Sequence, residues 1–403
     1  MDIASASHTR WVERNFPGLE GVIYLASAGR APIPQVSQQE MRRAYHEAFE
    51  DVNSVIDESL YLKNFREQAA RLINARTDEI AFTTSTTAGI NQFANSVNWR
   101  RGDKVLVPDL EYPSNVIPWE RVAKEKGARV LGIRSVNGLV PIEEIERRLD
   151  DRTKVLAISL VEFSTGQRFP LQRLSEACRE HGTLLFLDAV QALGAIDVDT
   201  SKADIAGLSA GGYKWLCGPL GSGLLYVSRR HADELEPKTI HWQSIRDSDR
   251  GYYWRKVVAG GCMTDAKARP TQDASAFEFS PEEVVQIAGL TASLRFLADL
   301  GPSSIEKRIA LLNDRALVLL DMLGFNVLTP RNAEERAGIM SFYPKRRISD
   351  LKEADRIASR LGRVKLVVRG GMFRCAAHFF NSRDDIDRAL SRTASACRKM
   401  DLL

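Results

Sequence analysis

The sequence reads LLFLDAVQALG from Leu184 to Gly194 and LSAGGYKWLCGPLGSG from Leu208 to Gly223. The first segment is an apolar run of strand length that ends in an acid, Asp188, followed by an amide, Gln191. The second segment places Lys214 after two glycines and directly before a tryptophan. Together they predict a buried strand with polar groups at its C-terminal end, and a glycine-rich turn that holds a lysine.

Further apolar runs of strand length lie on both sides of this stretch. Helical periodicity separates most of them, which favours a largely parallel sheet covered by helices on both faces. In such an open sheet a ligand binds beyond the carboxyl ends of the strands. The predicted strands include Ala128–Arg134, Lys154–Phe163, Thr183–Val190 and Ser222–Arg229.

The chain is long enough for two domains, since it has 403 residues. A predicted helix over Pro281–Leu300 ends at a Gly-Pro pair, and the remaining residues alternate between helix and short strand. We expect a large domain over residues 21–300, and a smaller α+β domain formed by residues 1–20 and 301–403.

Composition narrows the classes of protein to consider. A net charge of +4 does not favour a nucleic-acid partner. No apolar run approaches the roughly 20 residues of a membrane span, and the N-terminus lacks the apolar core of a signal peptide. The five cysteines form no CxxC pair and no metal-binding spacing. We therefore expect free thiols in the cytoplasm, with no metal site and no membrane association.

An acid at a strand tip and a lysine in a glycine-rich turn are the two groups that a pyridoxal 5'-phosphate (PLP) site needs. The PLP aldehyde requires an amine, and its ring nitrogen requires a carboxylate. Lys214 follows Gly211 and Gly212 and precedes Trp215, so we expect it to be desolvated, with a lowered pKa suited to imine chemistry. Taken singly, Asp188 could cap the next helix and Lys214 could lie at the surface.

Other segments add weaker signals. Thr86 and Thr87 precede a predicted helix, where hydroxyls and backbone amides can hold a phosphate, although such residues often act only as helix caps. Tyr112 could stack on a flat ring or be an ordinary loop residue. The sequence lacks GxGxxG, GxxxxGK[ST] and HExxH motifs, which weakens the dehydrogenase and nucleotide-hydrolase alternatives.

The ordered motifs TTAGIN, EYPSNVIPW, LDAVQALG, GYKWLCGPLGSG and RGGMFR resemble those of fold-type I PLP enzymes in the class V aminotransferase family. This group includes cysteine desulfurases, isopenicillin-N epimerase-like proteins and C–S lyases. The resemblance covers nearly the whole chain. It implies a largely parallel seven-stranded sheet with flanking helices, together with a smaller C-terminal α+β domain.

The resemblance also implies roles for residues around the cofactor. Lys214 matches the Schiff-base lysine that later carries the Cα proton, and Asp188 matches the acid at the pyridine nitrogen. Tyr112 stands where many relatives have a stacking histidine. We expect Tyr213 to compensate for a serine that relatives often have at position 211. The remaining cofactor-binding residues implied are Thr86 and Thr87 at the phosphate, Gln191 at the phenolic oxygen, and Ser280.

Substrate-binding residues follow from the same resemblance. Arg374 matches the arginine that binds the α-carboxylate of an amino-acid substrate through two parallel hydrogen bonds. The resemblance also places Ala28, Gly29, His241 and Trp242 at the substrate mouth. Ser280 matches a residue that reaches the cofactor phosphate of the other subunit, which implies a homodimer with shared active sites.

One departure from the family pattern concerns sulfur chemistry. The mobile persulfide cysteine of the desulfurases belongs in the loop before the carboxylate-binding arginine. Here that segment reads VKLVVRGGMFR and contains no cysteine. Cys375 follows Arg374 and would point to the opposite face of an alternating strand. We therefore expect a chain without a persulfide cysteine.

The reaction itself stays open at this point. The leading expectation is β-elimination (C–S lyase) chemistry on a cysteine derivative, with transamination about level. Epimerisation would need a second acid–base, for which Tyr112 is the candidate. A non-catalytic PLP-fold protein that binds a partner is the alternative from a different class.

Overall fold

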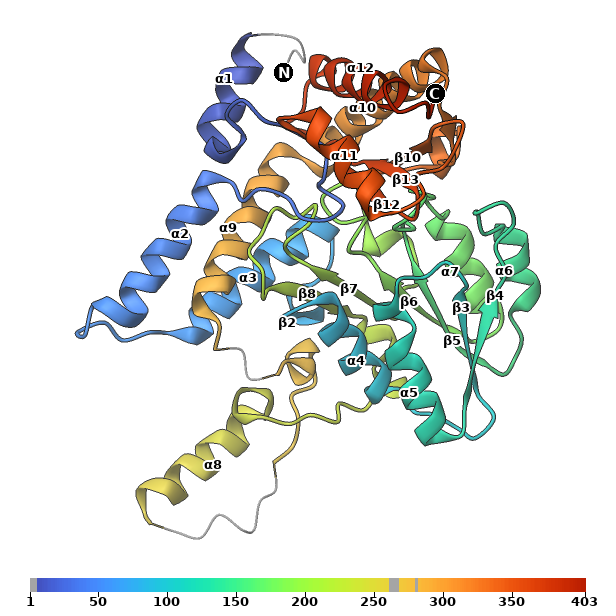
Figure 1. The fold of residues 1–403 in the computed structure, drawn as a ribbon. Helices are drawn as coiled ribbons and strands as arrows, with labels where there is room; N and C mark the ends of the chain where they lie inside the picture. The colour runs from blue at the N-terminus through green and yellow to red at the C-terminus, as the bar shows by residue number, and fades with distance from the viewer. Residues whose placement is uncertain (1–5, 261–267, 280–281) are drawn as a thin grey trace.

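The computed structural model describes residues 6–260, 268–279 and 282–403. Its centre is a seven-stranded sheet in the order β2-β8-β7-β6-β5-β3-β4, in which β8 alone runs antiparallel to its neighbours (Figure 1). The predicted α/β fold with a largely parallel sheet is confirmed. The strands are β2 (Ile80–Thr83), β3 (Lys104–Pro108), β4 (Arg129–Ile133), β5 (Thr153–Ser159), β6 (Leu184–Asp188), β7 (Gly207–Gly211) and β8 (Gly223–Val227).

Burial on both faces explains the continuous apolar runs of the central strands. Helices cover each face, and the apolar side chains beneath them form separate clusters. The predicted run from Lys154 to Phe163 ends as a strand at Ser159, and the chain that follows bonds to the segment around Ala337. The flanking helices are α3 (Glu58–Ile73), α4 (Thr86–Ser96), α5 (Ile117–Lys126), α6 (Ile142–Arg148), α7 (Leu171–Glu180) and α9 (Val284–Leu300).

A smaller sheet lies above the large one in Figure 1, with its own helices and core. Its strand order is β12-β13-β10-β9. The elements are β9 (Asn326–Val327), β10 (Met340–Tyr343), β12 (Val367–Arg369), β13 (Met372–Cys375), α10 (Pro302–Leu323), α11 (Leu351–Leu361) and α12 (Arg383–Arg398).

The start of the chain crosses between the two parts. Strand β1 (Ile23–Tyr24) pairs in parallel with β11 (Val364–Lys365), and Ile23 and Leu25 belong to the smaller core. The domain division expected from the sequence stays a prediction, but this pairing ties residues after position 20 to the smaller part. Within the described residues no single helix is both long and apolar enough to cross a membrane. Only α9 and α10 pass that test together, and they are bent by 77°.

Three helices lie at the periphery: α1 (Ala6–Asn15), α2 (Gln35–Tyr45) and α8 (Asp247–Val258). In Figure 1 α8 projects at the lower left, at the opposite end of the molecule from the smaller sheet.

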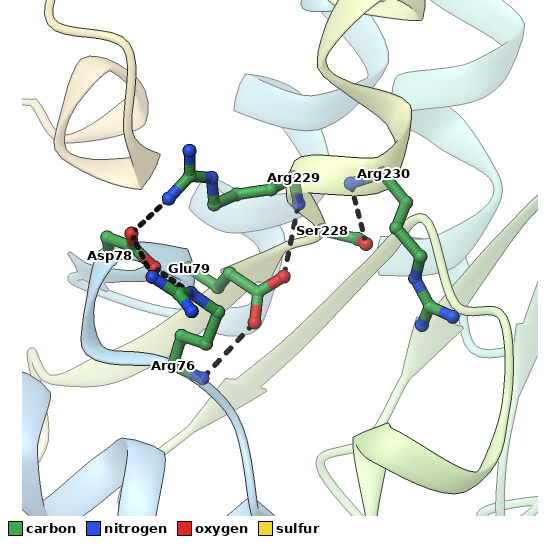
Figure 2. A network of polar contacts seen from close by, with 6 residues as sticks. All are labelled: Arg76, Asp78, Glu79, Ser228, Arg229 and Arg230. Atoms are coloured by element: carbon green, nitrogen blue, oxygen red, sulfur yellow. Dashed lines mark hydrogen bonds and ion pairs between the residues drawn. The ribbon is translucent and has the colours of Figure 1, made fainter.

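A polar network joins the start of β2 to the end of β8 (Figure 2). The Glu79 carboxylate accepts from the backbone N–H of Arg229 at 3.1 Å, and Asp78 accepts from the guanidinium groups of Arg76 and Arg229. Because β2 runs parallel to β7, its start lies at the sheet edge away from the carboxyl ends of the parallel strands. The network therefore has a structural role: it holds the start of β2 against the end of β8.

Candidate active site

The carboxyl ends of neighbouring strands bring the predicted catalytic residues together. Asp188 ends β6, and its register partner Ser159 ends β5. Lys214 follows the end of β7, and Tyr112 lies in the loop after β3. The Lys214 Nζ atom lies 5.9 Å from the centroid of the Tyr112 ring. Residues distant in sequence thus meet at the one edge where a parallel sheet binds ligands.

Lys214 is part-buried between aromatic rings. Its Nζ atom lies 5.7 Å from the Tyr213 ring centroid as well as near Tyr112. Burial lowers the pKa of Lys214 to about 8, since it outweighs the opposing effect of Asp188 and is assisted by Arg374 and Arg369. An amine with this pKa has a sizeable neutral, nucleophilic fraction close to neutral pH.

Two buried carboxyl groups interact with each other, and one of them, Asp188, interacts with this lysine. Burial raises the pKa of Asp188 to about 6, and its Oδ1 accepts from the Val190 N–H at 2.9 Å. Burial of the carboxylate, with Asp188 nearby, raises the pKa of Glu111 to about 8. The Glu111 carboxylate accepts from the hydroxyl of Ser159 at 2.7 Å and from the Ser159 N–H. Asp188 therefore ionises first, and Glu111 stays protonated beside it at neutral pH.

Glu111 was not among the residues predicted from the sequence. The available signal was its place directly before Tyr112 in the EYPSN motif. Its enclosure by Ser159 depends on the pairing of β3 with β5, which the motif does not reveal.

The predicted phosphate turn lies at the start of α4. Ser85 caps this helix by accepting from the Ala88 N–H at 3.1 Å, and Thr86 and Thr87 occupy the first turn, where backbone N–H groups lack helical partners. The Thr86 hydroxyl accepts from the Gly211 N–H at 2.8 Å, which ties this turn to the lysine turn. A β-carbon at Gly211 would lie 3.0 Å from the Tyr213 ring, so a larger residue would crowd the turn. An anion fits this helix N-terminus.

Gln191 is buried and already has two protein partners. Its Oε1 accepts from the Trp215 ring N–H at 2.8 Å, and its Nε2 donates to the Ala28 carbonyl at 3.0 Å. The second hydrogen on Nε2 is left for a cofactor oxygen. The same contacts bring Ala28 to the site, and a β-carbon at Gly29 would lie 3.9 Å from the Arg374 Nη2 atom.

Arg374 is a buried cation whose hydrogen-bonding capacity is mostly unused. It is 5 % exposed, its Nη1 donates to the Phe163 carbonyl at 2.9 Å, and its Nε has no partner. Burial lowers the pKa of Arg374 to about 10, so the group stays charged at neutral pH. Among the described residues no carboxylate forms an ion pair with it. A substrate carboxylate would satisfy this guanidinium.

Three predicted residues are not joined to this group. His241 and Trp242 precede α8, and Trp242 lines a hollow of about 740 Å³ with residues of α3, such as Leu62 and Arg66. They are not among the contacts given above for Lys214, Asp188 and Arg374. Ser280 lies outside the described residues. The roles of these three residues stay predictions.

Comparisons with known proteins show the family of the chain and proteins that share its fold. The family model for class V aminotransferases matches residues 23–390. A probable cysteine desulfurase of Pyrococcus abyssi is 26% identical, with 94% of this chain and 95% of the relative covered. A cysteine desulfurase of Salmonella typhimurium is 29% identical, with 94% of each chain covered.

Solved structures share the fold. The apo structure of a cysteine desulfurase from Thermococcus onnurineus has a TM-score of 0.84 at 22% identity, with 99% of each chain covered. The cystine C–S lyase C-DES in complex with cysteine persulfide has a TM-score of 0.82 at 21% identity, covering 94% of this chain and 99% of that one.

The residues present fit PLP: an amine of lowered pKa, a buried acid, a helix N-terminus for a phosphate and a partly exposed aromatic ring. The family match spans most of the chain, and the protein therefore belongs to the class V aminotransferase family of PLP-dependent enzymes.

Proposed function

We propose that the protein is a PLP-dependent C–S lyase that cleaves a cysteine derivative by β-elimination, without a persulfide-carrying cysteine of its own. The hairpin of β12 and β13, which contains Arg374, carries the absence of a persulfide cysteine in this proposal. Only Gly370 and Gly371 join the two strands, with φ values of 57° and 76°. Positive φ at both central positions is typical of a tight two-residue turn. Such a turn contains no cysteine and is too short to form a mobile loop.

The described cysteines are poor candidates for sulfur transfer. Cys375 lies in the smaller core, and burial raises the pKa of its thiol to about 12. Cys178, Cys217 and Cys397 are buried as well, whereas Cys262 lies outside the described residues. Because the thiolate is the reactive form, these buried thiols are unsuited to attack a substrate. Their free state also supports a cytoplasmic location, which is part of the proposal.

In this proposal each residue of the site has a defined task. Arg374 binds the α-carboxylate and so orients the substrate. Lys214 takes the proton from Cα and can give a proton to the sulfur that leaves Cβ as a thiol, for which a pKa of about 8 is well placed. Asp188 holds the positive charge on the cofactor ring. PLP, when bound, withdraws electrons from Cα. The names of the relatives, which are cysteine desulfurases, support a substrate with a cysteine C–S bond.

A homodimer with shared active sites is part of the same proposal. Apolar side chains are exposed between α2 and α3, where Phe49 is 67 %, Val52 93 % and Val55 92 % exposed. Trp254 on α8 is 62 % exposed. Several large exposed apolar side chains favour a protein interface. Light scattering should give twice the chain mass; a monomer that retains full activity would contradict shared sites.

The reaction is tested by incubating the holoenzyme with S-substituted cysteines in the absence of any keto acid. We expect pyruvate and ammonia in equal amounts, and the same rate from a Cys262→Ser variant. Strict dependence on an added keto acid would show a transaminase, and racemisation alone an epimerase. If Cys262→Ser no longer released the thiol product, the proposal that the protein has no persulfide-carrying cysteine would be wrong.

A further inference from the structure

A second arginine accompanies Arg374 on the hairpin. Strands β12 and β13 are antiparallel, with Val367 opposite Arg374 and Arg369 opposite Met372. Cross-strand partners share a face of the sheet, as do residues two apart along a strand. Arg369 and Arg374 therefore project from the same face as diagonal neighbours, which lie about 7–8 Å apart, with their β-carbons somewhat closer.

Aromatic rings hold the Arg369 side chain. Its Cζ atom lies 5.0 Å from the Phe163 ring centroid and 5.4 Å from that of Tyr112. These two rings pack edge to face, with centroids 5.2 Å apart. Since a guanidinium over a ring keeps its N–H groups available, this packing positions Arg369 without using its donors.

Arg369 also lies close to the reacting groups. The Tyr112 ring that it contacts is the ring next to Lys214. Its charge helps to lower the pKa of both Lys214 and Arg374. In the described part of the chain no carboxylate pairs with Arg369. Positive charge is therefore concentrated at the mouth of the site.

The acidic groups nearby act on Arg374 and Lys214, not on Arg369. Glu162 acts on Arg374, and its Oε2 also accepts from the N–H and hydroxyl groups of both Ser164 and Thr165. Glu111 is mostly protonated at neutral pH, and Asp188 interacts with Lys214. One α-carboxylate on Arg374 would leave the charge of Arg369 uncompensated.

We infer that Arg369 is a specificity-determining residue that binds a second anionic group, at the end of the substrate side chain. This inference rests on the proposed function and names its substrate class: an amino acid, of the cysteine-derivative type, whose side chain ends in a carboxylate or sulfonate. The separation of the two arginines suits a side chain of a few heavy atoms. Arginine offers planar paired donors that match either anion.

Two isosteric probes test the inference. S-carboxymethyl-L-cysteine carries the second anion, and S-carbamoylmethyl-L-cysteine has the same shape without the charge. Dissociation constants for the holoenzyme are measured from the cofactor absorbance. We expect the wild type to prefer the anionic probe by about 10- to 100-fold, the usual effect of a hydrogen bond to a charged group. In Arg369→Met this preference should fall to within about threefold, and Arg369→Glu should favour S-(2-aminoethyl)-L-cysteine.

Arg392→Met is the matched control, because it removes an exposed positive charge from α12. It should keep the preference of the wild type. Equal affinities in the wild type, or a preference that survives in Arg369→Met, would overturn the role of Arg369 and leave the proposed function intact. If the holoenzyme binds no amino acid at all, the proposed function fails as well. Unchanged cofactor absorbance in each variant confirms that it is folded.

Discussion

The strand-end floor, formed by Glu111, Asp188 and Lys214, differs in construction from the hairpin of residues 367–375. The floor belongs to the large sheet, and strand register fixes its carboxyl groups. The hairpin belongs to the smaller sheet and presents guanidinium groups that lack carboxylate partners among the described residues. The difference indicates that cofactor chemistry resides in the floor and substrate choice in the hairpin. The two functions should then be separable by mutation.

The largest effect is expected at Lys214. Lys214→Ala removes both the amine for the cofactor and the group that moves the Cα proton. Activity should fall by at least about 10²- to 10⁴-fold, the range of a lost general base. Steady-state rates of pyruvate release measure this loss. Lys202→Ala, which alters an exposed lysine paired with Asp199, should keep the wild-type rate.

A smaller effect that spares the cofactor is expected at Arg374. In Arg374→Gln the ratio kcat/KM should fall by about 10- to 100-fold, mainly through KM. The reason is the loss of the paired, charge-assisted hydrogen bonds from the guanidinium to the substrate carboxylate. Arg374→Lys should restore only part of it, since a lysine cannot bind bidentately. Cofactor absorbance should be that of the wild type. A variant that loses its cofactor would break the separation between hairpin and floor.

The smallest effect concerns the pH dependence of stability. The pKa of Glu111 is raised from its ordinary value to about 8, so its contribution to stability is present at low pH and is lost as the pH rises through about 8. Between the ordinary value of 4.5 and about 8, the free energy of unfolding falls by at most about 1.4 kcal/mol per pH unit. Glu111→Gln imitates the protonated acid and should flatten the curve.

Urea unfolding at pH 6 and pH 9 measures this difference. Glu120→Gln, an exposed change on α5, is the control and should follow the wild type. If the free energy of unfolding changes equally between pH 6 and pH 9 in the wild type and in Glu111→Gln, Glu111 does not titrate in this range.

Local sequence was sufficient to predict Asp188 and Lys214 in the floor, but not Glu111 or the hairpin residue Arg369. The apolar run before Asp188 and the glycines before Lys214 lie within short segments, so strand, turn and chemistry could be predicted together. The pKa of Glu111 depends on Ser159, 48 positions along the chain. The position of Arg369 depends on the β12–β13 register and on the Phe163 ring. Such contacts arise from tertiary packing, which motifs do not encode.

The division between floor and hairpin is tested most directly by borohydride reduction of the holoenzyme followed by peptide mass analysis. We expect reduced PLP on the peptide that contains Lys214, both in the wild type and in Arg374→Gln. Adding an S-substituted cysteine before reduction should protect Lys214 in the wild type, whereas Arg374→Gln should need at least about tenfold more of it. Cofactor on another lysine, or equal protection in both proteins, would contradict the account.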